Sequence, residues 1–255
     1  MAFTSVKKIV VGFLCQPAVG RLLAFAFRDR ISCQGCVIDT SSDIVTPKVK
    51  AMLFWRIYES AEIRFVRQYL NRDLDVIELG SSLGVVTCQI RKRMSGSHRL
   101  VSIEAHPELA RQVKSNLRIN GLDKKVSVIN KAIAYHPSQR KTAFYVFSGS
   151  NLTGHIAERQ NGARGLKVEA TTLSQIIDEN GISAYALVSD IEGAEAGFII
   201  HDQEALKKCR QIIIELHDTS INGVAIGTKQ MCDRLTGEHG FTLRDQYGPI
   251  YVFER

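Results

Sequence analysis

The sequence of 255 residues contains no apolar run approaching the roughly 20 residues that a transmembrane helix needs, so a membrane-spanning protein is not expected. Proline and glycine number only 5 and 19, without low-complexity stretches or internal repeats, which excludes a collagen-like fibre. Six cysteines are too few for a disulfide scaffold at this length, and the single CxxC pair, Cys33 and Cys36, lacks the second pair of a structural zinc site. We therefore expect reduced cysteines and a cytoplasmic protein.

The charge is moderate in amount but uneven along the chain. Charged residues make up 23% and hydrophobic residues 45%, as in a soluble globular protein with a sizeable core. Residues 1–74 carry 11 basic and 6 acidic residues, a balance of +5, whereas residues 75–255 carry 22 and 20, a balance of +2. The N-terminal third therefore presents either a solvated basic surface or a site for an anionic partner such as a phosphate, a sugar nucleotide or a lipid head group.

The N-terminal segment combines apolar residues with flanking cations. Lys7 and Lys8 precede the apolar run Ile9–Leu14, and Pro17 and Arg21 soon interrupt it. This pattern fits an amphipathic helix that packs on the domain, with a membrane surface as the alternative. We expect residues 1–73 to form a mainly helical extension.

From residue 75 onward, short apolar runs alternate with helical patterns. Such alternation predicts an α/β fold with a doubly wound, mostly parallel sheet, which we assign to residues 74–255. A terminal antiparallel hairpin is expected around Gly248 and Pro249. The expected strands are Asp75–Leu79, Leu100–Ile103, Val126–Asn130, Lys141–Phe147, Ala186–Ser189, Gln211–Leu216, Phe241–Tyr247 and Ile250–Phe253, and the expected helices are Val49–Leu70, Val85–Met94, Pro107–Asn120 and Thr172–Asn180.

The loop after the first of these strands is a candidate cofactor site. The segment from Glu78 to Gly84 reads Glu-Leu-Gly-Ser-Ser-Leu-Gly, an acidic residue followed by a glycine-rich turn. Ligands of doubly wound sheets bind outside the carboxyl ends of the strands, and glycine allows the backbone to approach them closely. Glu104 ends the next strand, where a carboxylate can accept hydrogen bonds from ribose hydroxyls. The spacing is GxxxG, with Ser82 in place of the middle glycine of a dinucleotide fingerprint, so an NAD-dependent dehydrogenase is disfavoured.

An acidic turn follows the strand that ends at Ser189. Its carboxylates are Asp190, Glu192 and Glu195, which need a cation, a proton or hydrogen-bond donors if they are buried. Asp190 is the preferred candidate for a base that deprotonates a hydroxyl, with Glu192 second and His217 a further candidate. Glu195 could instead begin a helix and bind its amides.

These residues together resemble the FkbM-type S-adenosylmethionine-dependent methyltransferases, within the class I methyltransferase fold. The resemblance covers about residues 74–217 well and 44–70 more loosely. The residues that carry it are Glu78-Leu79-Gly80-Ser81-Ser82-Leu83-Gly84, Glu104-Ala105-His106-Pro107, Asn116, Asn120, Asp190-Ile191-Glu192-Gly193-Ala194-Glu195 and Ile214-Glu215, with Tyr58-Glu59 and Glu62 in the looser part.

The resemblance implies a seven-stranded sheet with a reversed last strand, S-adenosylmethionine as the methyl donor and usually an O-methyl product. Gly80 and Gly84 would approach the methionine part of the donor, Glu104 would bind its ribose, and Lys131, Ala132 and Ile133 would lie near the adenine. The implied cofactor-binding residues are Glu78, Gly80, Ser81, Ser82, Gly84, Glu104, Ala105, Lys131, Ala132 and Asp190.

The resemblance leaves the methyl acceptor open. We expect a hydroxyl of a sugar, a glycan or another small-molecule precursor, and the polar loop Ser148–Gly154 could line its pocket. A nucleic-acid methyltransferase is the alternative, disfavoured because the Asp/Asn-Pro-Pro-aromatic loop is lacking after Ser189 and no aromatic platform interleaves with the basic residues. A non-catalytic nucleotide-binding scaffold is a further alternative. We assign no metal site, although a divalent cation on the acidic turn stays open, as does the oligomeric state.

Overall fold

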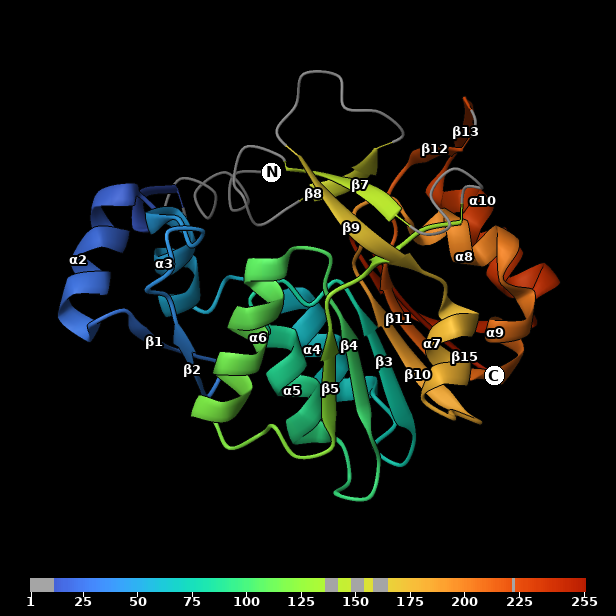
Figure 1. Ribbon diagram of the computed structural model, residues 1–255, viewed down its shortest axis with the longest axis horizontal. Helices are drawn as coiled ribbons and strands as arrows, with labels where there is room; N and C mark the ends of the chain where they lie inside the picture. Colours follow the sequence, from blue (N-terminus) through green and yellow to red (C-terminus); the bar gives the residue numbers. More distant parts are fainter. Residues whose placement is uncertain (1–11, 136–141, 148–153, 158–164, 222) are drawn as a thin grey trace.

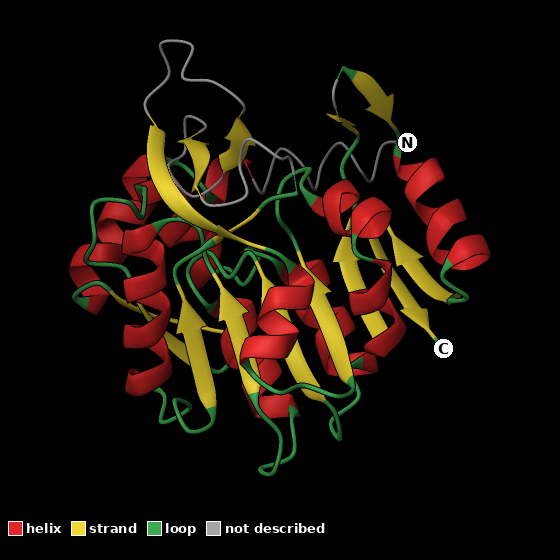
Figure 2. Cartoon of the chain, turned by 45° about the vertical axis from the view of Figure 1, so that its right-hand side comes forward, coloured by secondary structure: helices red, strands yellow, loops and turns green. Residues whose placement is uncertain are grey.

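The computed structural model describes residues 12–135, 142–147, 154–157, 165–221 and 223–255 (Figure 1). Its central sheet has seven strands in the order β14-β15-β11-β10-β3-β4-β5. Figure 2 shows these strands side by side, with helices in front of and behind them. The strands are β3 (Asp75–Leu79), β4 (Leu100–Ile103), β5 (Val126–Ile129), β10 (Tyr185–Ser189), β11 (Cys209–Glu215), β14 (Thr242–Tyr247) and β15 (Ile250–Glu254).

The topology confirms the predicted fold class. Strands β5, β4, β3, β10 and β11 run parallel, whereas β15 pairs antiparallel with both β11 and β14. The chain enters the central sheet at β3, in its middle, and adds β4 and β5 on one side. It then crosses to the other side of β3, where it adds β10. In sheets of this kind, the carboxyl ends of the two strands at such a reversal of strand order, here β3 and β10, are the usual ligand site.

Helices cover both faces because the strands are apolar on both sides. Along β3, Val76 packs into one hydrophobic cluster and Ile77 into the other. The first cluster contains α4 (Ser60–Tyr69), α5 (Val85–Arg93) and α6 (Pro107–Ile119). The second contains α7 (Leu173–Glu179), α8 (Glu195–His201), α9 (Gln203–Lys208), α10 (Thr228–Asp233) and the π-helix Arg234–Glu238.

The N-terminal part is less helical than the sequence suggested. It contains α2 (Pro17–Phe27), a hairpin of β1 (Arg30–Cys33) and β2 (Cys36–Asp39), and α3 (Pro47–Phe54). The single helix expected over Val49–Leu70 is wrong: α3 and α4 are separate helices. Arg56 and Glu59 both have positive φ, +59° and +48°, a conformation that no α-helix accommodates.

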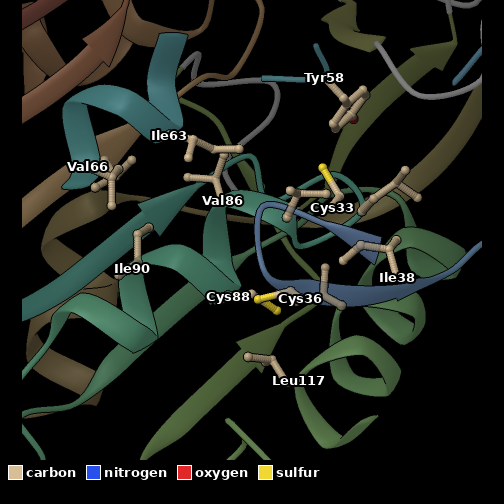
Figure 3. Packing of buried hydrophobic residues seen from close by; sticks show 14 of the residues in the cluster. Cys33, Cys36, Ile38, Tyr58, Ile63, Val66, Val86, Cys88, Ile90 and Leu117 are labelled. Atoms are coloured by element: carbon tan, nitrogen blue, oxygen red, sulfur yellow. The ribbon is translucent and has the colours of Figure 1, made fainter. Parts of the chain in front are cut away.

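The hairpin is bound to α6 by two asparagines, Asn116 within the helix and Asn120 at its C-cap. Asn116 accepts a hydrogen bond from the Asp39 amide at 2.9 Å, and Asn120 accepts one from the Val37 amide at 2.8 Å. Figure 3 shows Cys33, Cys36 and Ile38 of the hairpin packed among residues of α4, α5 and α6. The N-terminal residues from 31 onward therefore share one core with the sheet, although the division at residue 74 stays a prediction.

A second, four-stranded sheet lies above the carboxyl ends of the main one (Figure 1). Its order is β6-β9-β7-β8, and the strands are β6 (Ala132–Ile133), β7 (Thr142–Phe147), β8 (Gly154–Ala157) and β9 (Gly165–Thr171). The sequence predicted β7 but not β6, β8 or β9; β8 pairs with β7, and β9 pairs with both β6 and β7. A small hairpin of β12 (Thr219–Ile221) and β13 (Val224–Ile226) was not predicted either.

The packing of α2 on α3 requires glycine at position 20. A Cβ at Gly20 would lie 1.6 Å from the Pro47 carbonyl oxygen, so Gly20→Ala should lower the free energy of unfolding by about 1–3 kcal/mol, as overpacking does. Urea unfolding measures this difference. Gly237→Ala, where a Cβ meets nothing within 4 Å, is the matched control. Equal stability of the two variants would contradict the close contact.

Candidate functional site

The site is built where the ends of β3 and β10 touch. Gly80, the first residue after β3, has φ +82°, and a Cβ there would lie 1.8 Å from the Asp190 carbonyl oxygen. The Asp190 amide in turn donates to the Leu79 carbonyl at 3.0 Å. Only glycine permits both this backbone conformation and this approach. The predicted glycine loop and acidic turn are therefore brought into direct contact.

The glycine loop contains a non-glycine residue in the left-handed conformation. Ser82 has φ +46°, the kind of backbone geometry that glycine adopts more readily, and two contacts hold it there. Its amide donates to the Glu104 carboxylate at 2.8 Å, and its hydroxyl shares a 2.8 Å hydrogen bond with the Tyr58 hydroxyl. Gly84, with φ +77°, then begins α5. A serine thus occupies the position at which a dinucleotide fingerprint has its middle glycine.

Glu104 ties the ends of β3 and β4 together. One carboxylate oxygen accepts the Ser82 amide and the other accepts the His106 amide, each at 2.8 Å. The side chain is only 4% exposed, and burial raises its pKa to about 7. Asn130 reinforces this strand end by donating to the carbonyls of Glu104 and Ala105. The ribose-binding role of Glu104 stays a prediction.

Glu78 is a buried carboxyl inside the sheet. It is 1% exposed and accepts a hydrogen bond from the Thr87 hydroxyl of α5 at 3.0 Å. Burial raises its pKa to about 7. Glu78 therefore lies beneath the glycine loop and supports it from the core.

Glu195 is a structural carboxylate of the acidic turn: it begins a helix, as the sequence suggested, but the amides that it binds belong to the preceding turn and not to the helix. This side chain is fully buried and begins α8, and its two oxygens accept the amides of Ile191 and Gly193, both at 2.9 Å. The turn between them passes through Glu192 and Gly193 with φ of +52° and +98°. Glu195 thereby fixes the turn that presents Asp190.

His217 follows β11 and is surrounded by carboxylates. Its Nε2 lies 3.6 Å from Glu192 and 3.5 Å from Glu215, and its Nδ1 lies 3.5 Å from Glu195. The carboxylates of Glu195 and Glu215 raise the pKa of His217 to about 11. A histidine with that pKa is a cation at neutral pH, which suits it to neutralising carboxylates better than to accepting a proton.

Asp190 is a buried carboxyl at the carboxyl end of β10. Burial, followed by the charges of Glu215 and Glu192, raises its pKa to about 7. Its Oδ1 atom is inaccessible to solvent and has no hydrogen-bond partner among the described residues. Asp190 thus combines a pKa near neutrality with an unpartnered oxygen, two properties of a general base.

The sequence analysis did not assign Tyr58, Glu59, Glu62 or Glu215 to the site. Glu62 is 8% exposed and belongs to α4, and burial raises the pKa of both Glu59 and Glu62 well above the usual range. The charge of Asp190 acts in the same direction on both carboxyls. All four residues belong to the family resemblance, which is the signal in the sequence that points to a place in the site.

Lys131 and Ala132 directly follow Asn130, and their expected place near the adenine stays a prediction. The Lys131 ammonium pairs with Glu169 of β9 at 3.0 Å and Glu179 of α7 at 3.7 Å, and Ala132 is buried in β6. Residues 148–153 of the expected acceptor loop lie outside the described part of the chain. Within the described residues, Asp190, Glu195 and His217 place three possible metal ligands within 4.8 Å of one another, but both Glu195 oxygens already accept amides.

Comparison with known proteins identifies a family. The profile described as "Methyltransferase FkbM domain" matches residues 80–243, which include the glycine loop, the acidic turn and His217. No match to a curated protein was found.

Solved structures show more distant likenesses. A protein in the NADB-Rossmann superfamily from Streptococcus agalactiae is 12% identical, with a TM-score of 0.44 over 77% of this chain and 68% of that one. A protein proposed to be an RNA methyltransferase, from Pyrococcus horikoshii, is 11% identical, with a TM-score of 0.43 over 92% and 96%. The O-methyltransferase from Bacillus cereus in complex with SAH is 14% identical, with a TM-score of 0.40 over 76% and 78%. At these scores the likenesses indicate no substrate.

Because Gly80 contacts Asp190, alanine should destabilise the protein more at Gly80 than at another glycine with positive φ. Gly80→Ala should lower the free energy of unfolding by several kcal/mol, because the new methyl group forces β3 and β10 apart in addition to straining φ. Gly121→Ala is the matched control, since Gly121 has φ +65° but open space around a Cβ. Urea denaturation of both variants compares them. If Gly80→Ala lowered the free energy of unfolding no more than Gly121→Ala does, the ends of β3 and β10 would tolerate separation.

The buried carboxyl of Glu78 predicts how stability depends on pH. Its pKa rises from 4.5 to about 7 on folding, so the folded state binds more protons between these values and stability falls as pH rises through that window. Glu78→Gln should remove this loss and gain up to about 3 kcal/mol relative to the parent protein between pH 5 and pH 8. Urea unfolding at both pH values tests it, with the exposed Asp123→Asn as control. Parallel pH profiles for parent and Glu78→Gln would refute it.

Proposed function

The chain belongs to the family of methyltransferases with an FkbM domain, and from this premise we propose that it transfers a methyl group from S-adenosylmethionine to a hydroxyl of a sugar, a glycan or another small-molecule precursor. The observation that carries the proposal is the contact of Gly80 with Asp190. It brings a buried, unpartnered carboxyl oxygen to the carboxyl ends of the central strands, where ligands of this fold bind.

The residues at this edge fit the donor. The Ser81 hydroxyl and Oδ1 of Asp190 are both buried and have no hydrogen-bond partner among the described residues. Both atoms can therefore form a hydrogen bond with a polar ligand. Gly80 leaves no side chain between the loop and the turn. The loop of Gly80, Ser81 and Ser82 would hold the methionine part, and Glu104 the ribose. When bound, S-adenosylmethionine supplies a methyl group on a positively charged sulfur.

The charge of the site supports a cationic donor and a small acceptor. Burial raises the pKa values of Glu59, Glu62 and Asp190, and neighbouring carboxylates raise them further. Asp190 and Glu215 act on Glu59 and Glu62, and Glu215 and Glu192 act on Asp190, so an added cation would relieve this repulsion. The phosphodiester backbone of a nucleic acid would be repelled by the same carboxylates. This electrostatic balance favours a small acceptor over the nucleic-acid alternative.

Asp190 is the residue we assign to proton removal. A hydroxyl attacks more readily when a base accepts its proton in the transition state, and a base with a pKa close to neutrality does so efficiently. Glu195 orients the turn that carries Asp190, and His217 in its protonated form neutralises Glu192 and Glu215. Alignment of acceptor and donor by the surrounding loops would supply the rest of the rate enhancement.

Replacement of Asp190 tests its role as base. Asp190→Asn should lower kcat by about 100-fold or more, while donor affinity measured by calorimetry changes only a few-fold. In the parent protein, kcat should rise with pH up to about 7 and then level off, and the variant should lose this dependence. The exposed Asp123→Asn serves as control. Undiminished turnover of Asp190→Asn would reject Asp190 as the base.

The acceptor class needs a separate experiment. The purified protein is incubated with methyl-labelled S-adenosylmethionine and a cell extract divided into nuclease-treated and untreated halves. We expect label in a small-molecule or glycan fraction of both halves, attached as an ether that resists alkali. Label that disappears after nuclease treatment would favour the nucleic-acid alternative, and label in an amine would contradict O-methylation.

A further inference from the structure

Helix α2 exposes its apolar residues instead of burying them. Leu22 is 67% exposed and Phe25 is 86% exposed, and the two lie on one face because they are three residues apart. The buried residue of this helix is Gly20, through which it packs on α3. A helix on a globular protein ordinarily places its apolar stripe toward the core. The orientation of α2 is the reverse of that expectation.

Further exposed aromatic residues lie before α2, at its last residue and directly after α3. Phe13 is 67% exposed, Phe27 46% and Trp55 40%. The Phe27 ring lies 5.4 Å from that of Phe54, which lies 4.9 Å from the Trp55 ring, and the Trp55 indole donates to the Leu14 carbonyl at 3.1 Å. Of the nine large hydrophobic residues that are exposed in the described part of the chain, five belong to this region. We call Leu22 and Phe25 the α2 surface, since Phe27 lies on the opposite side of the helix, against Phe54 of α3.

The α2 surface is bordered by cations. Arg21 adjoins Leu22 within the helix and Arg28 ends the helix, and both are exposed. The acidic neighbour Asp29 is already paired with Lys50 at 2.6 Å. Figure 1 shows α2 at the outer margin of the molecule, away from the central sheet. The surface therefore offers apolar side chains within a positively charged rim.

We propose that the α2 surface docks on an anionic phospholipid bilayer. Phenylalanine and leucine insert at the boundary between head groups and acyl chains, and flanking arginines pair with anionic head groups. A second copy of the chain fits less well, because a two-fold contact would place Arg21 and Arg28 against the same cations. In the described residues, no helix is long and apolar enough to cross a membrane, so the proposed contact is peripheral.

Sedimentation with vesicles tests the proposal on the full chain. Phosphatidylcholine vesicles containing phosphatidylserine should bind the parent protein, and vesicles of phosphatidylcholine alone should bind it much more weakly. The double variant Leu22→Ser with Phe25→Ser should lose at least about tenfold in affinity for the anionic vesicles, and Arg21→Gln should reduce the preference for phosphatidylserine.

The matched control is the double variant Val224→Ser with Leu243→Ser, which removes exposed apolar residues elsewhere on the surface. It should bind like the parent, and unfolding midpoints of all variants confirm that they are folded. Absence of parent binding to anionic vesicles, or equal binding by the Leu22/Phe25 variant, would overturn the proposal. A dimer in solution that dissociates only in the Leu22/Phe25 variant would also overturn it, by showing that a second copy covers the surface.

Discussion

The site depends on one backbone contact, the approach of Gly80 to the Asp190 carbonyl at a distance that excludes any side chain. This contact joins the ends of β3 and β10, the two strands between which the order of the sheet reverses. The glycine loop, the acidic turn and the buried carboxyl of Asp190 all derive their relative positions from it. Most other features of the site hold this junction in place or balance its charge.

The charge balance of the site has a physical consequence. Asp190 and Glu215 add to burial in raising the pKa values of Glu59 and Glu62, and Glu215 and Glu192 do the same for Asp190. The His217 cation lies beside Glu192 and Glu215. Burying several carboxylates without cations is unfavourable, so the group is partly protonated or awaits a positively charged ligand. The methyl donor of the family has that charge, and its binding would relieve a repulsion that the fold itself creates.

The N-terminal part takes part in the site as well as in the core. Asn116 and Asn120 fasten the β1–β2 hairpin to α6, and the interruption between α3 and α4 brings Tyr58 to Ser82. The left-handed conformation of Ser82 is thus stabilised by a residue more than twenty positions earlier in the chain. Within the described residues, the same N-terminal part leaves Leu22 and Phe25 of α2 exposed. The segment therefore has a structural role, through the hairpin and Tyr58, that is distinct from the docking role proposed for α2.

The sequence by itself determined the fold class, the parallel strands, the terminal hairpin and the positions of Gly80, Glu104 and Asp190, because hydrophobic alternation and glycine turns are local signals. Only the tertiary structure decided that Val49–Leu70 is broken, since Arg56 and Glu59 adopt positive φ values that end the helical conformation between α3 and α4. It also decided that Glu59, Glu62 and Glu215 join the site, and that His217 is a cation while Asp190 titrates near neutrality. Those properties arise from burial and from the summed charges of several strands and helices, which no local pattern encodes.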